Sequence, residues 1–293
     1  MALSFLADIG DIEQEAETFV QQLFQSYSLI LDQSAKQKIQ ESIKHLFHLK
    51  KHHTIETNPD AENEMVDIPG ATDNWKTLSK ASIMVMHNVL FPTSVWFKSK
   101  EMLQFLKQWF VAQIKPMRIW SVGSGLGYEP YSISCCFSEV EHFFEKNSLP
   151  PLTIIGSEVS TEAMAIAKQG IYAKAALKGV SWFQKRKFFQ KIVQDKGPYY
   201  QLKDKEKSRI DFITQDILKG FHQLGFFDMI FCTEILPYFA PQLRYAIACR
   251  LSDRLKPNGY LFLGEENIDF SDLPEMKRVE LDSGFLYQKQ DRR

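Results

Sequence analysis

The first third of the chain has apolar residues at helical spacing, interrupted by one polar stretch. Between residues 12 and 55 large apolar side chains recur every three or four positions, which predicts amphipathic helices. Residues 57–73 combine two prolines, a glycine and several Asn and Asp residues, which is typical of a loop or linker. Helical spacing resumes over 75–89 and again over 100–112. The pattern predicts a helical N-terminal domain with its linker over residues 1–85.

From Met117 the pattern changes to short apolar runs that alternate with helical segments. The apolar runs predict strands, and the segments between them predict helices. Strands separated by helices favour a doubly wound, mostly parallel sheet with helices on both faces. We therefore expect an α/β domain over residues 86–293. The expected strands are 118–122, 152–155, 210–213, 227–231 and 260–263, and the expected helices are 129–145, 161–169 and 242–255.

The composition is that of an ordinary folded protein and excludes several function classes. Hydrophobic residues make up 44% of the 293 residues, and the formal net charge is −1. The balanced charge gives no overall attraction to nucleic acid. No apolar run reaches the ~20 residues that a membrane-spanning helix needs. We therefore expect neither a nucleic-acid partner nor membrane insertion.

The N-terminal segment and the cysteines indicate the compartment. The first residues become acidic where a secretory signal peptide would be basic and then apolar. The four cysteines show no C-x-x-C spacing and no framework of a small disulfide-rich domain, so we expect reduced interior thiols. Both observations favour a cytoplasmic protein.

A glycine-rich turn follows the first expected strand and opens the next helix. It reads Gly123-Ser-Gly125-Leu-Gly127. Glycine lets the backbone turn sharply and approach a ligand closely. The dinucleotide fingerprint G-x-G-x-x-G would place its third glycine at position 128, where this chain has Tyr128. The loop therefore suits a ligand without a pyrophosphate, although a plain turn of glycines explains it equally well.

Acidic residues follow the next two expected strands. Glu158 stands where doubly wound folds place a carboxylate for ribose hydroxyls. Asp216 and Ile217 offer an acid and an apolar side chain for the edge and face of an adenine ring. Acids are common at strand ends, but their order behind the glycine loop favours a nucleoside ligand. The lysine of a phosphate-binding loop is missing, so a positively charged sulfonium such as S-adenosylmethionine fits better than a phosphate-rich nucleotide.

Several segments resemble the chemotaxis receptor methyltransferases of the CheR family. The run Trp120–Ser132 resembles the family's first motif, which ends in G-E-E-P-Y-S. Ala167–Tyr172 looks like its A-x-x-G-I-Y, and Leu255–Gly264 looks like its L-K-P-G-G-x-L-x-x-G. Phe227–Cys232 with Tyr238-Phe239 resembles its F-D-x-I-F-C-R-N-V-x-I-Y-F. Order and spacing agree over residues 90–293, and the helical N-terminus resembles the family's substrate-side domain.

This resemblance implies an S-adenosylmethionine-dependent O-methyltransferase that acts on glutamate side chains of a methyl-accepting, coiled-coil chemoreceptor. It also implies the seven-stranded methyltransferase sheet with a small all-α N-terminal domain, and we expect a monomer. Lys98 and Tyr238 would be the catalytic residues, with Tyr238 near the transferred methyl group. By position, the cofactor contacts would be Ser94, Lys98, Gly123, Gly125, Gly127, Glu129, Glu158, Asp216, Ile217, Glu234 and Ile235.

The chain departs from the family pattern near the expected chemistry. The family's N-x-T-x-F-F-R segment is Pro92–Lys98 here, and its C-R-N is Cys232–Glu234. Lysine is a point charge on a flexible stem, whereas arginine is a planar, two-pronged donor to carboxylates. Glu234 would repel an acceptor glutamate if it faced the methyl group. A second hypothesis is therefore a catalytically weak, S-adenosylmethionine-binding docking module of a chemosensory array. A third, a nicotinamide-dependent oxidoreductase, is disfavoured by Tyr128.

A histidine-rich segment lies on the second expected helix. His48 and His52 are four residues apart, but no third ligand clearly completes a metal site, so we expect no metal. The neighbouring lysines fit two interpretations equally well. One is a basic face that docks on an acidic receptor bundle, and the other is a solvated face.

Two segments of the second half carry further candidate chemistry. Ser181–Phe189 mixes aromatic and basic residues, as some nucleic-acid binders do, but it coincides with a structural helix of the family. Residues 197–203 and 209–213 predict a small antiparallel excursion. In some members of the family such an insert binds a receptor tail peptide.

Overall fold

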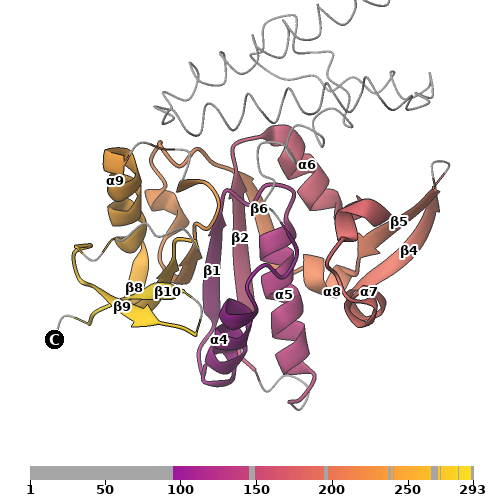
Figure 1. Cartoon of the computed structure of the whole chain (residues 1–293), viewed down its shortest axis with the longest axis horizontal. Coiled ribbons are helices and arrows are strands. Elements are labelled where there is room, and N and C mark those ends of the chain that lie inside the picture. Colours follow the sequence, from indigo (N-terminus) through magenta and orange to yellow (C-terminus); the bar gives the residue numbers. More distant parts are fainter. Residues whose placement is uncertain are drawn as a thin grey trace, which may run out of the picture. The chain divides into compact units, whose positions relative to one another are not determined.

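The computed structural model describes residues 95–144, 149–194, 197–236, 239, 241–264, 270, 272–282 and 284–291. The described residues within 91–235 and 245–293 form one compact unit, which makes up most of the coloured ribbon in Figure 1. The expected helical domain over 1–85, the histidine-rich segment, Ser94 and Tyr238 lie outside the described residues. In the part of the chain that the structure describes, no helix is long and apolar enough to cross a membrane.

A seven-stranded sheet forms the centre of this unit. Its strand order is β6-β2-β1-β7-β8-β10-β9. The first five of these strands are parallel, and β10 runs antiparallel to both β8 and β9. The expected doubly wound, mostly parallel sheet is confirmed. The strands are β1 (Met117–Val122), β2 (Leu152–Glu158), β6 (Ile210–Thr214), β7 (Phe227–Phe231), β8 (Leu255–Phe262), β9 (Met276–Glu280) and β10 (Phe285–Lys289).

Helices with clear local signals flank the sheet. The hydroxyl of Ser99 accepts a hydrogen bond from the amide of Met102 at the start of α4 (Lys100–Val111), and Ser160 caps α6 (Thr161–Gln169) in the same way. Gly170 ends α6 at φ 64°, a conformation that favours glycine. In Figure 1 α4 lies in front of the lower part of β1 and β2, and α5 lies to the right of β2. The helices are α4 (Lys100–Val111), α5 (Tyr128–Glu141), α6 (Thr161–Gln169) and α9 (Pro241–Ser252).

The boundary between α9 and β8 differs from the expectation. The predicted helix 242–255 ends at Ser252, and Leu255 instead begins β8, which was expected only from residue 260. The cause is strand pairing, because the amide of Phe227 donates to the carbonyl of Arg254 at 2.9 Å and Leu255 then pairs with Phe227. Backbone pairing in the sheet thus overrides the apolar spacing that favours a longer helix.

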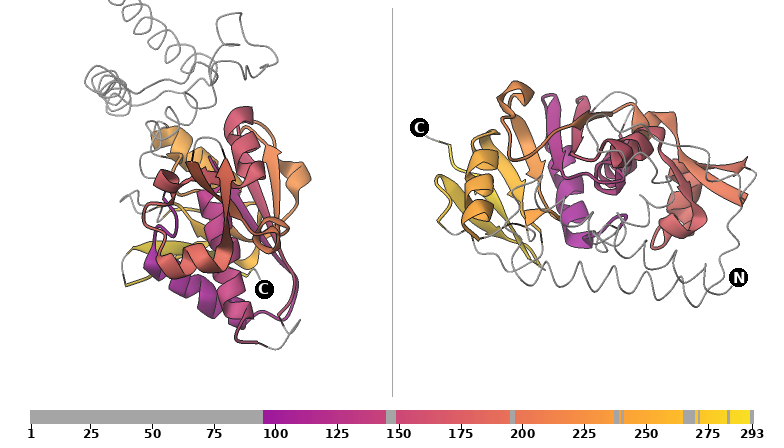
Figure 2. Two further views of the ribbon diagram at one scale, coloured as in Figure 1. Left: turned by 90° about the vertical axis from the view of Figure 1, so that its right-hand side faces the viewer. Right: turned by 90° about the horizontal axis from the view of Figure 1, so that it is seen from above.

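A separate three-stranded antiparallel sheet follows α6. Its order is β3-β5-β4, with β3 at Ile171–Ala173, β5 at Gly197–Leu202 and β4 at Phe189–Gln194. The helix expected around 181–189 is confirmed as α7 (Trp182–Phe188). Figures 1 and 2 show this sheet beside the β6 edge of the main sheet. The short elements nearby are η3 (Lys174–Leu177), α8 (Asp204–Lys207) and η4 (His222–Leu224).

The expected pairing of 197–203 with 209–213 is wrong. Residues 197–202 pair with β4 and β3, whereas β6 runs parallel to β2 in the main sheet. The amide of Ile154 donates to the carbonyl of Arg209 at 2.8 Å, which brings the segment before β6 into the parallel ladder. The antiparallel excursion therefore ends before residue 209.

Buried aromatic residues hold the strands that carry the site. Trp120 on β1 is fully buried, and its indole N–H donates to the hydroxyl of Ser157 on β2 at 2.8 Å. Its ring also contacts Phe221 and Phe227, with centroids 5.0 and 5.3 Å away. These contacts link β1 to β2 and β7 and help to hold the three strands in register. The carboxyl ends of these strands lie side by side.

Candidate active site

The predicted site residues meet at the carboxyl edge of the parallel strands. The glycine loop follows β1, Glu158 ends β2, Asp216 follows β6 and Glu234 follows β7. Because these four strands are adjacent and parallel, their carboxyl ends lie at one edge of the sheet. Ligands of open α/β sheets bind in the crevice at this edge, where the strand order reverses. The structure therefore brings the described members of the predicted set to one place.

The glycine loop adopts a backbone that other residues would strain. Gly123, Gly125 and Gly127 have φ angles of 68°, 51° and 89°, in the left-handed region that favours glycine. A Cβ atom at position 123 would overlap with Cγ2 of Ile235. Ile235, predicted as a cofactor contact, thus packs directly on the first glycine. We call the loop with Gly123, Gly125 and Gly127 the glycine cradle, and it has no room for a side chain at position 123.

Glu158 ties the end of β2 to this loop. The residue is buried, at 7% exposed. One carboxylate oxygen accepts the amide of Gly125 at 3.0 Å, and the other accepts the amides of Val159 and Ser160 at 2.7 and 3.1 Å. A carboxylate has about four lone-pair positions, so these three bonds leave capacity for a further donor. Glu158 both orders the loop and presents an acceptor beside it.

Glu129, at the start of α5, carries a perturbed carboxyl group. Its two oxygens accept hydrogen bonds from the hydroxyls of Ser121 and Thr233, each at 2.6 Å. Burial raises the pKa of Glu129 to about 7, partly opposed by these two hydrogen bonds. The nearby charge of Glu234 raises this pKa further, and that of Lys98 lowers it. Glu129 is therefore a group whose charge changes near neutral pH.

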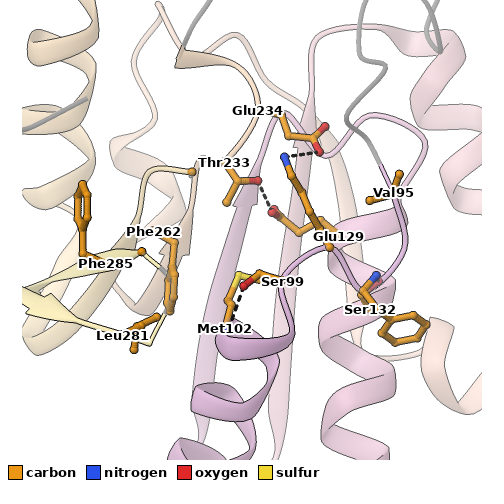
Figure 3. Close-up of a pocket in the computed structure, with 14 residues that line it drawn as sticks. Val95, Ser99, Met102, Glu129, Ser132, Thr233, Glu234, Phe262, Leu281 and Phe285 are labelled. Carbon is orange, nitrogen blue, oxygen red and sulfur yellow. Dashed lines mark hydrogen bonds and ion pairs between the residues drawn. The ribbon is translucent and has the colours of Figure 1, made fainter. Parts of the chain in front are cut away.

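The Ser121 and Thr233 hydroxyls had not been predicted as part of the site. They lie on β1 and just after β7, and Figure 3 shows Thr233 directed at Glu129. A hydroxyl at the carboxyl end of a strand that neighbours the glycine loop is the signal that could have identified them. Their role is to hold the Glu129 carboxyl group in one orientation.

Lys98 and Glu234 form an ion pair in the same pocket. The ammonium nitrogen of Lys98 lies 3.6 Å from a carboxylate oxygen of Glu234, and the two side chains are 26% and 14% exposed. Figure 3 shows the carboxylate of Glu234 near that of Glu129. Glu234 thus lines the same pocket as Glu129, and whether it faces the methyl group stays a prediction. Its charge is balanced by Lys98.

The segment before Lys98 is fixed by an unusual anchor. Trp96 is buried, donates its indole N–H to the carbonyl of Ala176 at 3.1 Å, and packs on Tyr128 with centroids 4.9 Å apart. Phe97 has a φ of 54°, which is strained for a residue with a side chain. Its amide donates to the hydroxyl of Ser132 at 3.0 Å. This anchor sets the direction in which Lys98 leaves the backbone.

The pocket around these charges has an apolar side. Figure 3 shows Phe262, Leu281 and Phe285 facing the charged residues across the opening. A mixed lining of this kind fits a ligand or side chain that has both a charged end and an apolar stem. The lining residues are Val95, Phe97, Lys98, Ser99, Met102, Glu129, Ser132, Thr233, Glu234, Phe262, Gly264, Leu281, Gly284 and Phe285.

The loop after β6 is held in place by an arginine. Asp216 accepts the amide of Leu218 at 2.9 Å, which makes a tight turn. Arg250 on α9 donates to the carbonyls of Ile217, Leu218 and Lys219, and its guanidinium stacks 4.7 Å above the ring of Phe221. Asp216 and Ile217 are thus presented at the carboxyl edge by a rigid turn.

The site is rich in acids and has the features of a site for a cationic ligand. Glu158 accepts the amide of Gly125 in the glycine loop, and Glu129 and Glu234 line the pocket together with Lys98, which supplies one positive group. Within the described ranges, no group of three or more His, Cys, Asp or Glu side chains could hold a metal ion. The arrangement can bind a positively charged nucleoside derivative and hold a carboxylate near Lys98.

Comparisons with known proteins match the same part of the chain. Residues 93–282 match the family described as "CheR methyltransferase, SAM binding domain". "Chemotaxis protein methyltransferase 1" of Pseudomonas aeruginosa is 31% identical over 218 residues, which cover 70% of this chain and 76% of the relative. "Chemotaxis protein methyltransferase Cher2" of Pseudomonas putida is 30% identical over 208 residues, 67% of this chain and 72% of the relative. A "Chemotaxis protein methyltransferase" of Vibrio parahaemolyticus is 26% identical over 200 residues, 67% and 71% of the two chains.

Proposed function

This chain belongs to the CheR methyltransferase family, and we propose that it transfers the methyl group of S-adenosylmethionine to glutamate side chains of a methyl-accepting chemoreceptor. The observation that carries this proposal is the pocket that Lys98 lines together with the carboxylates of Glu129 and Glu234. The relatives whose names record chemotaxis protein methyltransferases support the same activity. The proposal assigns the enzyme to the cytoplasm as a monomer, with a protein as its partner.

The residues present fit S-adenosylmethionine. The loop after β1 carries glycine at positions 123, 125 and 127, and the lack of side chains there suits close approach of a nucleoside to the backbone. In the proposed arrangement Glu158 accepts from the ribose hydroxyls, and Asp216 with Ile217 contacts the adenine. Glu129, Lys98 and Glu234 then surround the amino-acid end of the cofactor. Carboxylates attract its ammonium and sulfonium charges, and this attraction is stronger in a partly buried pocket than in water.

The reaction requires no general acid or base from the protein. When bound, the cofactor supplies a methyl carbon that is activated for in-line displacement by its sulfonium. A glutamate carboxylate has an ordinary pKa of about 4.3 and is already ionised at neutral pH. One of its oxygens forms the new C–O bond as the C–S bond breaks, and no proton is removed. The protein's contribution is alignment, which can lower a barrier by roughly 7–11 kcal/mol.

Lys98 is the residue that we assign to alignment of the acceptor. Its ammonium group lies in the pocket and is held by the anchored Trp96–Phe97 segment. An ammonium group can hold one acceptor oxygen while the other attacks. Glu234 already neutralises Lys98 at 3.6 Å, so the acceptor must share this lysine with Glu234. Productive binding therefore requires Glu234 to turn partly away or to keep only a weakened ion pair.

The same ion pair favours a second candidate function. If Glu234 pairs with Lys98 permanently, the negative charge of Glu234 occupies the position that the acceptor carboxylate needs. The chain would then bind S-adenosylmethionine and dock on a chemosensory array with little methyl transfer. Binding of the cofactor does not separate the two candidates, but the rate of methyl transfer does.

Transfer of labelled methyl groups to receptor-containing membranes tests the proposal. We expect label in the receptor fraction that is released as volatile methanol by mild alkali, because glutamyl methyl esters are base-labile. A matched sample with the Gly123→Ala variant, which should not bind cofactor, controls for non-enzymatic labelling. Cofactor binding without any transfer to the host's receptors would favour the docking module. Absence of cofactor binding by the folded wild-type protein would contradict both candidates.

A further inference from the structure

The segment around the three-stranded sheet has a charge unlike the rest of the chain. Residues 171–203 contain eight basic residues and one acidic residue, Asp195, whereas the whole protein has a formal net charge of −1. Such a local concentration of bases creates a positive potential that attracts anionic surfaces. The proposed methyl-transfer site does not use it. The basic residues are Lys174, Lys178, Lys185, Arg186, Lys187, Lys191, Lys196 and Lys203.

Helix α7 presents two large aromatic rings within this segment. Trp182 is 71% exposed and Phe183 is 62% exposed, whereas Phe188 on the other side of the helix is buried. The guanidinium of Arg186 lies 5.4 Å from the Trp182 ring, and the ammonium of Lys187 lies 5.7 Å from the Phe183 ring. We name Trp182, Phe183, Arg186 and Lys187 the aromatic–basic face. On it, aromatic rings and cations occupy one side of the helix.

The aromatic–basic face rests on a well-fixed helix. Ser181 and Gln184 form a reciprocal capping box at the start of α7. At its end, the ammonium of Lys203 donates to the carbonyls of Arg186 and Lys187 at 3.3 and 2.6 Å. Hydrogen bonds therefore stabilise both ends of this short helix. The two exposed rings project from this helix and not from a loop.

We propose that the aromatic–basic face binds the surface of an anionic lipid bilayer. A deformable apolar layer can bury aromatic rings that project from a protein surface. A lipid bilayer has such a layer just below its charged head groups. Tryptophan is enriched at that depth, and clusters of lysine and arginine are attracted to acidic lipids. Stable attachment takes an apolar and a basic signal together, and this face supplies both. An acidic helical protein would match the charge but would need matching hollows for two projecting rings.

This proposal is independent of methyl transfer and is tested by vesicle flotation with the full chain. Vesicles of phosphatidylcholine with phosphatidylglycerol are compared with vesicles of phosphatidylcholine alone. We expect binding to the anionic vesicles only, weakened by high salt because exposed charges are screened. The double variants Trp182→Ala/Phe183→Ala and Arg186→Glu/Lys187→Glu should each lower the partition constant by roughly tenfold or more. Calorimetric affinity for S-adenosylmethionine confirms that each variant is folded.

The matched control is Phe143→Ala. Phe143 is 83% exposed, follows the end of α5 at Glu141, and lies outside residues 171–203 in the sequence. This variant should bind anionic vesicles as the wild type does. Equal binding to neutral and anionic vesicles, no binding to either, or equal losses in the control would overturn the proposal. Binding of an acidic helical receptor fragment through the same four residues, without vesicle binding, would overturn it in favour of a protein partner.

Discussion

The ammonium group of Lys98 lies 3.6 Å from the carboxylate of Glu234, although the two residues are 136 positions apart in the sequence. Lys98 precedes α4, and Glu234 follows β7. Both belong to the short segments in which this chain departs from the CheR pattern. The two departures are therefore spatially coupled, because a lysine and a glutamate in contact balance one another's charge. This coupling decides how an acceptor carboxylate can enter the pocket.

Removal of the Lys98 ammonium group should slow methyl transfer much more than it weakens cofactor binding. In Lys98→Ala we expect a fall in the single-turnover rate of about a hundredfold, corresponding to nearly 3 kcal/mol, with cofactor affinity changed by less than tenfold. An interaction made mainly in the transition state appears in the rate and not in ground-state affinity. Single-turnover assays and calorimetry measure the two quantities. Equal losses in rate and affinity would make Lys98 a cofactor contact only.

Two matched variants sharpen this prediction. Lys98→Arg should keep or raise the rate, because a forked donor suits a carboxylate better than an ammonium group does. Glu234→Gln should raise kcat/KM for the receptor by a few-fold, since a partly exposed ion pair is worth up to about 1 kcal/mol and its loss leaves Lys98 to the acceptor. A rate that falls in Glu234→Gln would show that Glu234 assists the transfer.

Ionisation of Glu129 should make cofactor affinity depend on pH. Burial raises its pKa to about 7, so a cationic cofactor binds a partly protonated site at neutral pH. The cation favours the ionised carboxylate, so affinity should rise between about pH 6 and pH 8 and then level off. Calorimetry across this range measures the effect, and Glu129→Gln should remove most of it. An unchanged pH profile in a folded Glu129→Gln protein would exclude Glu129 as the cause.

The same carboxyl group should affect the stability of the cofactor-free protein in the opposite sense. Its pKa is raised from an ordinary value of 4.5 to about 7, so the folded chain binds this proton more tightly than the unfolded chain does. Its contribution to stability is therefore present below about pH 4.5 and is lost as pH rises through 7. Denaturant titrations at several pH values, with Glu129→Gln as the control, measure this contribution.

Gly123 should be essential for cofactor binding, in contrast to Gly179, which also has a positive φ angle. Gly123 has φ 68° and no room for a Cβ atom beside Ile235, whereas Gly179 has φ 90° and no atom within 4 Å of a Cβ. Alanine at either position costs about 1–2 kcal/mol of backbone strain, but only Gly123→Ala adds a collision. Gly179→Ala should bind cofactor normally, and Gly123→Ala should not. Thermal unfolding with and without S-adenosylmethionine compares them.

Loss of the Glu158 carboxylate should weaken cofactor binding by roughly 1.5–3 kcal/mol, the range for hydrogen bonds to charged groups. Its bond to the Gly125 amide at 3.0 Å means that the variant also loosens the glycine loop. Glu280→Ala is a suitable control, because Glu280 lies on β9 away from the glycine loop. A folded Glu158→Ala protein with wild-type affinity would remove this residue from the site.

The sequence predicted elements best where local signals were complete. The bounds of α6 match the predicted 161–169 because Ser160 caps its start and Gly170 ends it. The β9–β10 hairpin was missed because β9 reads Met-Lys-Arg-Val-Glu, with too few apolar residues to show a strand pattern. Its place in the sheet comes from pairing with β10, which local sequence does not encode.

The sequence predicted which side chains would gather at the carboxyl edge, but it did not predict the contacts between them. The acids at the strand ends and the glycines could be located because topology fixes where parallel strands finish. The Ser121–Glu129–Thr233 hydrogen bonds join residues from β1, α5 and the segment after β7, so no spacing rule links them. Likewise, the sequence raised the question of where Glu234 points, and only the folded chain places it against Lys98.

Identification of the methylated residue tests whether this chain transfers methyl groups to glutamate side chains. Receptors from the host, incubated with the enzyme and S-adenosylmethionine, are digested and sequenced by mass spectrometry, with heat-inactivated enzyme as the control. We predict methyl esters on glutamate side chains of the receptor's coiled coil, absent from the control and strongly reduced with Lys98→Ala. Methylation only of nitrogen atoms on lysine or arginine, or no methylation by an enzyme that binds the cofactor, would contradict this prediction.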